Sequence, residues 1–96
     1  MLSASYPVNK LENSLLRSQW VKNLTEKAIA YHADGVNIDI EEPVKEKSKE
    51  MSLLTKLANE TAVAFHTKIP GSQVRQRLRS EHLKLNRYYN YISPRS

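Results

Sequence analysis

The chain has 96 residues, a size that allows one small domain with a limited core. With 40% hydrophobic and 26% charged residues its composition is typical of a globular protein, and no hydrophobic run approaches the roughly 18 residues that a membrane-spanning helix needs. Cysteine is absent, which excludes a disulfide-stabilised scaffold, and the opening residues lack the basic and hydrophobic regions of a signal peptide.

The charge is concentrated in the last quarter of the chain. Residues 71–96 hold six basic residues and one acidic residue, and this segment accounts for the whole net charge of +5. We therefore place a boundary near Val74, between a first segment at 1–74 and a basic, divergent tail at 75–96. The tail is expected to be irregular or to form a short helix around Ser80–Arg87.

The first part of the chain predicts one long helix. Residues 1–10 have no regular pattern and are expected to be an irregular lead-in. From about Glu12 to His32, hydrophobic residues recur at steps of three and four, which predicts an amphipathic helix. Asn9 followed by Glu12 is a weak match to a capping box at its start. The predicted buried stripe consists of Leu16, Trp20, Leu24, Ala28 and Tyr31.

A strand and a second helix are predicted next. Hydrophobic and polar residues alternate strictly from Val36 to Glu41, which indicates a strand, and Pro43 is expected to end it. After a charged link at 45–50, a second helix is predicted, closed by Pro70 and Gly71. This order of helix, strand and helix is typical of an α/β protein with parallel strands. The stripe of the second helix consists of Met51, Leu54, Leu57, Ala58, Ala62 and Phe65.

The predicted strand carries a row of polar side chains. Because strand residues alternate between faces, Asn37, Asp39 and Glu41 share one face, and the two carboxylates lie about 6.5 Å apart along it. Such a row is costly in a hydrophobic core but suits the solvent-open interior of a parallel barrel. Glu41 lies at the carboxyl end of the strand, where barrel active sites gather. Two carboxylates this close resist simultaneous ionisation, so a protonated Glu41 could act as an acid catalyst while Asp39 stays ionised.

The segment Asp34-Gly35-Val36-Asn37-Ile38-Asp39-Ile40-Glu41 resembles the acid-bearing strand of the family 18 glycoside hydrolases. The resemblance extends over about residues 15–74. It implies an α/β fold that is a fragment of a (β/α)₈ TIM barrel, with Glu41 and Asp39 as catalytic residues supported by Asn37 and Asp34. The family has Asp more often than Asn at the position of Asn37.

The resemblance also implies a substrate and a location. The family hydrolyses β-1,4-linked N-acetylglucosamine by substrate-assisted acid catalysis without a metal or other cofactor. The flanking residues resemble lysosomal members that act on the chitobiose core of oligosaccharides. The sequons at Asn23 and Asn59 are candidate glycosylation sites in that setting.

Several alternatives remain open at this point. A whole barrel needs about 250 residues, so the chain is expected to be a truncated product that is inactive alone. No position matches the tyrosine that the family places on a later strand. The polar row of Asn37, Asp39 and Glu41 could also be the solvated face of an edge strand. The chain as a whole could be a non-catalytic carbohydrate-binding fragment. A nucleic-acid-binding tail is disfavoured, because no recognition motif accompanies its arginines.

Overall fold

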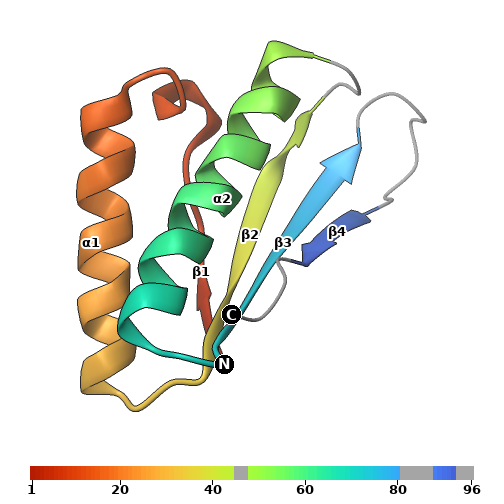
Figure 1. Cartoon of the computed structure of the whole chain (residues 1–96). Helices are drawn as coiled ribbons and strands as arrows, with labels where there is room; N and C mark the ends of the chain where they lie inside the picture. Colours follow the sequence, from red (N-terminus) through yellow and green to blue (C-terminus); the bar gives the residue numbers. More distant parts are fainter. Residues whose placement is uncertain (45–47, 81–87, 93–96) are drawn as a thin grey trace.

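In the computed structural model, residues 1–44, 48–80 and 88–92 are described. They form one sheet, in the order β1-β2-β3-β4, with two long helices on one side of it (Figure 1). The first three strands are parallel, and β4 is antiparallel to β3. The elements are β1 (Leu2–Ala4), the 3₁₀ helix η1 (Val8–Lys10), α1 (Ser14–Ala30), β2 (Gly35–Val44), α2 (Lys49–Lys68), β3 (Gln73–Ser80) and β4 (Tyr88–Ile92).

Helix α1 confirms the first predicted helix, but its start and its buried side differ from the prediction. The N-cap is Asn13, whose side chain accepts a hydrogen bond from the Leu16 amide at 3.1 Å, while Asn9 lies in η1. Leu24 and Ala28 of the predicted stripe are buried and Trp20 packs against the core, as predicted. Leu16 and Tyr31 are 40% and 65% exposed, so the prediction was wrong for these two. The buried positions are Arg17, Val21, Leu24, Thr25 and Ala28.

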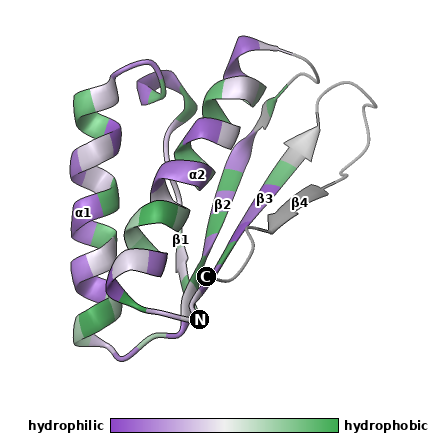
Figure 2. Cartoon of the chain, in the orientation of Figure 1, coloured by the Kyte–Doolittle hydropathy of each residue, from purple (hydrophilic) through white to green (hydrophobic). Residues whose placement is uncertain are grey.

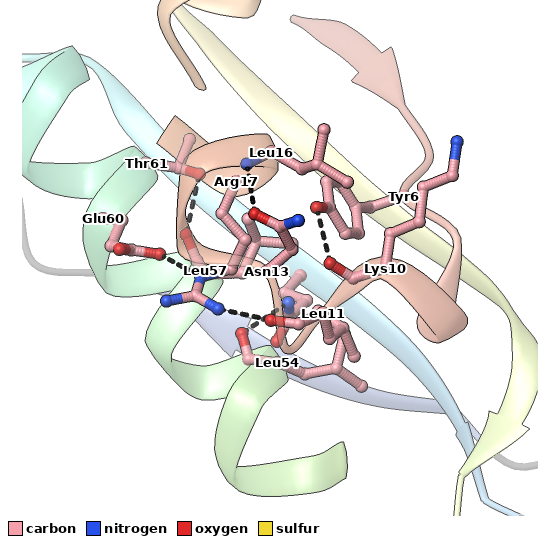
Figure 3. Close-up of polar contacts among 11 residues, drawn as sticks. Tyr6, Lys10, Leu11, Asn13, Leu16, Arg17, Leu54, Leu57, Glu60 and Thr61 are labelled. Atoms are coloured by element: carbon pink, nitrogen blue, oxygen red, sulfur yellow. Dashed lines mark hydrogen bonds and ion pairs between the residues drawn. The ribbon is translucent and has the colours of Figure 1, made fainter. Parts of the chain in front are cut away.

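The buried Arg17 explains why the predicted buried stripe of α1 differs in part from the observed one. Arg17 is only 3% exposed, and its guanidinium bridges two parts of the fold. Its Nε donates to Oε1 of Glu60 on α2 at 2.8 Å, and its Nη1 donates to the carbonyl of Leu11 (Figure 3). A hydrophobic pattern cannot identify a position whose burial depends on such partners.

Helix α2 confirms the second predicted helix and most of its stripe. The Ser48 hydroxyl caps it by accepting from the Met51 amide at 3.2 Å. Phe65 is fully buried, and Met51 is half-buried at the edge of the core. The buried side consists of Leu54, Leu57, Ala58, Thr61, Ala62 and Phe65.

The structure corrects two predictions around β2. The first residues are not all irregular, since Leu2–Ala4 form β1 and pair parallel with β2, Ser3 opposite Asn37. Strand β2 also continues past Pro43 to Val44, because its register with β3 shifts between Ile40 and Pro43. A proline is tolerated at such a bulge, where the regular hydrogen-bond ladder is already interrupted.

The start of the basic tail is a strand rather than irregular or helical structure. Strand β3 crosses the proposed 74/75 boundary, which remains a prediction as a domain limit, and residues 88–92 form β4. Val74, Gln76 and Leu78 are buried against the helices, and the Gln76 amide donates to the Leu54 carbonyl at 2.9 Å. The predicted helix around Ser80–Arg87 falls almost entirely outside the described residues.

The core lies between the helices and one face of the sheet. Val36, Ile38 and Ile40 are fully buried in it, so the alternation predicted for β2 is confirmed, and Figure 2 shows hydrophobic and hydrophilic bands along β2 and β3. Gly35 allows these strands to approach closely, since a Cβ there would lie 2.2 Å from the Gln73 carbonyl oxygen. In the described part of the chain, neither helix has the length and hydrophobicity to cross a bilayer.

Candidate active site

The face of the sheet opposite the helices carries the polar row predicted from the sequence. Asn37 and Asp39 are half-buried and Glu41 is exposed, whereas their neighbours on β2 point into the core. Ser3 extends the face on the β1 side and is also exposed. The structure therefore places Asn37 and Asp39 on one accessible face, and the exposed Glu41 follows them along the same strand.

Glu41 lies where the β2–β3 ladder is interrupted. Ile40 pairs with Leu78 and Pro43 pairs with Arg79, so Glu41 and Glu42 together form the bulge in β2. Bulges bend a strand and re-aim its side chains, and they are frequent beside active sites. Glu42 already has a partner, because its Oε1 accepts a hydrogen bond from the Val8 amide at 3.3 Å. Of the two glutamates in the bulge, Glu41 is the better candidate for contact with a ligand.

Asp34 is not brought together with the other predicted site residues. It precedes the amino end of β2, five residues and about 16 Å along the strand from Asp39. Its carboxylate is 88% exposed and lies 3.5 Å from the N-terminal ammonium group of Met1. Its carbonyl accepts a hydrogen bond from the Gln73 amide at 3.1 Å, which ties the starts of β2 and β3 together. A supporting catalytic role for Asp34 remains a prediction.

Both candidate glycosylation sites lie within helices. Asn23 on α1 and Asn59 on α2 are exposed. The threonines of the two sequons are buried, and their hydroxyls donate to carbonyls one turn earlier, Thr25 to Val21 at 2.7 Å and Thr61 to Leu57 at 2.8 Å. These threonines therefore have a structural role of their own, and glycosylation of the asparagines remains a prediction.

Two arginines on the same face were not among the predicted site residues. Arg75 and Arg77 of β3 are exposed, and their Cα partners on β2 are Asn37 and Asp39. The alternation in Val74-Arg75-Gln76-Arg77-Leu78 is the signal that could have placed them there. From the sequence alone, the polar run Arg75-Gln76-Arg77 favours a divergent tail instead, because it lacks the hydrophobic residues of a barrel strand.

Other potential sites contribute little. Within 1–44, 48–80 and 88–92, no group of three or more His, Cys, Asp or Glu side chains is arranged to hold a metal ion. A hollow of about 460 Å³ lies between the helices, lined by Val21 and Lys22 of α1 and by Glu60, Val63 and Lys68 of α2. It contains none of the predicted site residues. The uncovered sheet face is therefore the best candidate site.

Comparison with known proteins agrees with the family resemblance predicted from the sequence. Over 73 residues, or 76% of its length, the chain is 37% identical to the di-N-acetylchitobiase of Bos taurus. Over 74 residues, or 77% of its length, it is 39% identical to the enzyme of that name from Rattus norvegicus. The chain is similar to part of the di-N-acetylchitobiases. The human protein of that name, at 35% identity over 74 residues, shows the same relationship.

The match to the di-N-acetylchitobiases covers only part of those proteins. The chain spans 42% of the bovine relative and 20% of the rat relative, both of which bear the name of a glycosidase. No family model matches the chain, and no solved structure matches it to a significant degree. The similarity therefore includes most of this chain but less than half of the bovine protein and about a fifth of the rat and human proteins.

Proposed function

We propose that β2 is the acid-bearing strand of a family 18 type glycoside hydrolase that cleaves β-1,4-linked N-acetylglucosamine in chitobiose-containing oligosaccharides. The observation that carries this proposal is the position of Asp39 and Glu41. Both lie toward the carboxyl end of a parallel strand, on the face that the helices leave uncovered, in a chain similar to the di-N-acetylchitobiases. That end of the strands is where catalytic groups gather in barrel enzymes.

In the proposed mechanism, the two carboxylates have different roles. Glu41 donates a proton to the glycosidic oxygen and so assists departure of the leaving sugar. The carbonyl oxygen of the substrate's own N-acetyl group attacks the anomeric carbon, as in substrate-assisted glycosidases. Asp39 orients that N-acetyl group, and Asn37 extends the polar row behind it. The exposed position of Glu41 in the bulge gives a substrate access to it.

The proposed architecture is a segment of a (β/α)₈ barrel. Two consecutive units, β1–α1–β2 and β2–α2–β3, each join parallel neighbours through a helix, which is the repeating unit of such a barrel. A closed barrel needs eight strands, so we propose that catalysis requires strands beyond these and that the 96-residue chain has no turnover alone. The lysosomal location implied by the resemblance is part of the same proposal.

The proposal can be tested in a chimera. Residues 15–74 would replace the matching segment of the rat di-N-acetylchitobiase, and release of N-acetylglucosamine from a chitobiose-containing oligosaccharide would be measured. We expect the chimera to be active and Glu41→Gln to lower kcat by about 10²–10⁴-fold, the usual effect of losing a general acid.

Glu42→Gln is the matched control, because Glu42 is the adjacent glutamate of the same bulge. It should retain most of the activity. A circular dichroism spectrum that is unchanged from the chimera establishes that each variant is folded. A folded Glu41→Gln chimera with full turnover would refute the assignment of the acid.

A further inference from the structure

The face of the sheet opposite the helices carries a basic row, Arg75 and Arg77, beside the acidic row that contains Asp39 and Glu41. On β3, Arg75 and Arg77 are exposed, while Val74, Gln76 and Leu78 between and beside them are buried. The two guanidinium groups therefore extend from the same face as Asp39 and Glu41. Two residues along a strand correspond to about 6.5 Å, so the two arginine positions are close enough for one ligand to contact both.

The two arginines differ in the charge of the residue opposite them on β2. Arg77 has Asp39 as its Cα partner, so a carboxylate lies directly across the strand pair from it. Arg75 has Asn37 as its partner, and Asn37 in turn pairs with Ser3 on β1. This level of the face thus holds one positive charge beside two neutral side chains. Among the described residues, no carboxylate forms an ion pair with Arg75.

Such an arrangement favours an anionic ligand. Two like charges on one strand face repel each other, and Asp39 opposes this repulsion only at the level of Arg77, so an anion beside Arg75 would lower the remaining cost. The planar guanidinium group binds sulfate, phosphate and carboxylate through two parallel hydrogen bonds. Asp39 lies diagonally from Arg75, at a Cα distance of about 8 Å, so one oligosaccharide could reach both positions.

We propose that Arg75 and Arg77 form a subsite for an anionic substituent, such as a sulfate or phosphate ester, on the oligosaccharide that occupies the acidic row. The inference rests on the proposed function, since the acidic row supplies the contact to the N-acetyl group. It adds a substrate class to that function, namely N-acetylglucosamine oligosaccharides that carry an acidic group. The arginines are specificity-determining residues and take no part in bond cleavage.

The test is a binding titration of the full 96-residue chain, monitored by the NMR signals of the arginine Nε–H groups. The probes are chitobiose, chitobiose 6-sulfate and inorganic sulfate. We expect chitobiose 6-sulfate to bind about tenfold or more tightly than chitobiose, because a charged hydrogen-bond pair has about that effect on affinity. We also expect the signals of Arg75 and Arg77 to shift with the sulfated sugar and not with the neutral one.

Two variants separate the subsite from general attraction. Arg75→Gln should reduce the preference for the sulfated sugar to about onefold, whereas Lys22→Gln, which removes an exposed cation from α1 on the helix side, should leave it unchanged. Equal affinity for the two sugars, equal effects of the two variants, or no binding of either sugar would overturn the subsite. So would inorganic sulfate binding as tightly as the sulfated sugar, which would indicate an anion site without a sugar.

The proposed function is decided independently of this result. Turnover of the neutral oligosaccharide by the chimera reports on Glu41, whatever the arginines bind. A short RNA serves as a further probe, because exposed arginines also bind phosphates in nucleic acids. If the RNA binds more tightly than chitobiose 6-sulfate and loses that affinity in Arg75→Gln, the face is a nucleic-acid surface and the sugar subsite is wrong.

Discussion

Nε of Arg17 on α1 lies 2.8 Å from Oε1 of Glu60 on α2, and this ion pair joins the two helices next to the core. The arginine is 3% exposed, whereas the glutamate side chain is 33% exposed. The same guanidinium donates to the Leu11 carbonyl, so it also holds the turn that precedes α1. A charge this deeply buried is tolerated only while its partners remain in place.

Removing the acidic partner should therefore destabilise the fold. We expect Glu60→Gln to lower the free energy of unfolding by about 1–3 kcal/mol, because Arg17 keeps its charge in a buried position without its carboxylate. Urea denaturation followed by Trp20 fluorescence would measure this loss. The control is Glu12→Gln, which breaks the exposed pair with Lys49 at 3.0 Å and should cost less than about 0.5 kcal/mol. Equal losses in the two variants would show that the buried pair has no special weight.

A second prediction concerns the close approach of β2 and β3. In Gly35→Ala the new Cβ would lie 2.2 Å from the Gln73 carbonyl oxygen, so the two strands must separate where their pairing begins. We expect a loss of about 2–3 kcal/mol in the free energy of unfolding, measured by urea denaturation with far-UV circular dichroism.

Gly71→Ala is the comparison for this variant. Gly71 has a φ of 81° and no atom within 4 Å of an added Cβ, so its cost of about 1 kcal/mol would come from backbone strain alone. If Gly71→Ala proved the more damaging of the two, the steric argument for Gly35 would be wrong.

A third prediction concerns stability at alkaline pH. Burial raises the pKa of Tyr6 above its usual value of 10.0, and its hydroxyl donates to the Lys10 carbonyl at 3.0 Å. The folded state therefore retains the phenol proton at a pH where the unfolded chain releases it. The stabilisation is complete below pH 10 and is lost as the pH rises through the pKa of the folded state.

The variant Tyr6→Phe removes this titration. We expect it to be less stable than the parent at pH 8 by about 1 kcal/mol, through loss of the hydrogen bond, and the difference to shrink as the pH rises above 10. Urea denaturation at several pH values would measure the difference. Tyr31→Phe serves as the control for loss of an exposed tyrosine hydroxyl, because Tyr31 is 65% exposed. A stability difference for Tyr6→Phe that stays constant across the pH range would contradict the assignment.

The sequence predicted the elements whose burial is mainly hydrophobic. The faces of β2 followed from the alternation of Val36, Ile38 and Ile40, all fully buried, and α2 followed from its regular stripe. Predictions were wrong where a polar side chain occupies a core position. Arg17 on α1 and Gln76 on β3 are buried because they donate hydrogen bonds to residues of α2. Those residues are distant in the sequence. Strand β1 was not predicted, because its three residues are too few to show a strand pattern and are a strand only through their pairing with β2.

The candidate site was predictable to a similar extent. Strand alternation alone predicted that Asn37, Asp39 and Glu41 share one face, and the burial pattern agrees for Asn37 and Asp39, while Glu41 is exposed in the bulge. The register that sets Arg75 and Arg77 beside them depends on the parallel pairing of β2 with β3, which no local pattern specifies. The bulge at Glu41 and Glu42 is likewise a property of the strand pair. Its effect on Glu41 could not be predicted from β2 in isolation.

The antiparallel pairing of β4 with β3 limits how this sheet can be extended. Each strand has two hydrogen-bonding edges, and those of β3 are taken up by β2 on one side and by β4 on the other. A parallel strand that continued a barrel next to β3 would need the edge where β4 now lies. The two pairings exclude each other, so completing the barrel on that side would first require β4 to detach. The outer edge of β1 carries no such competitor among the described strands, and a parallel neighbour could add there without displacing any part of this fold.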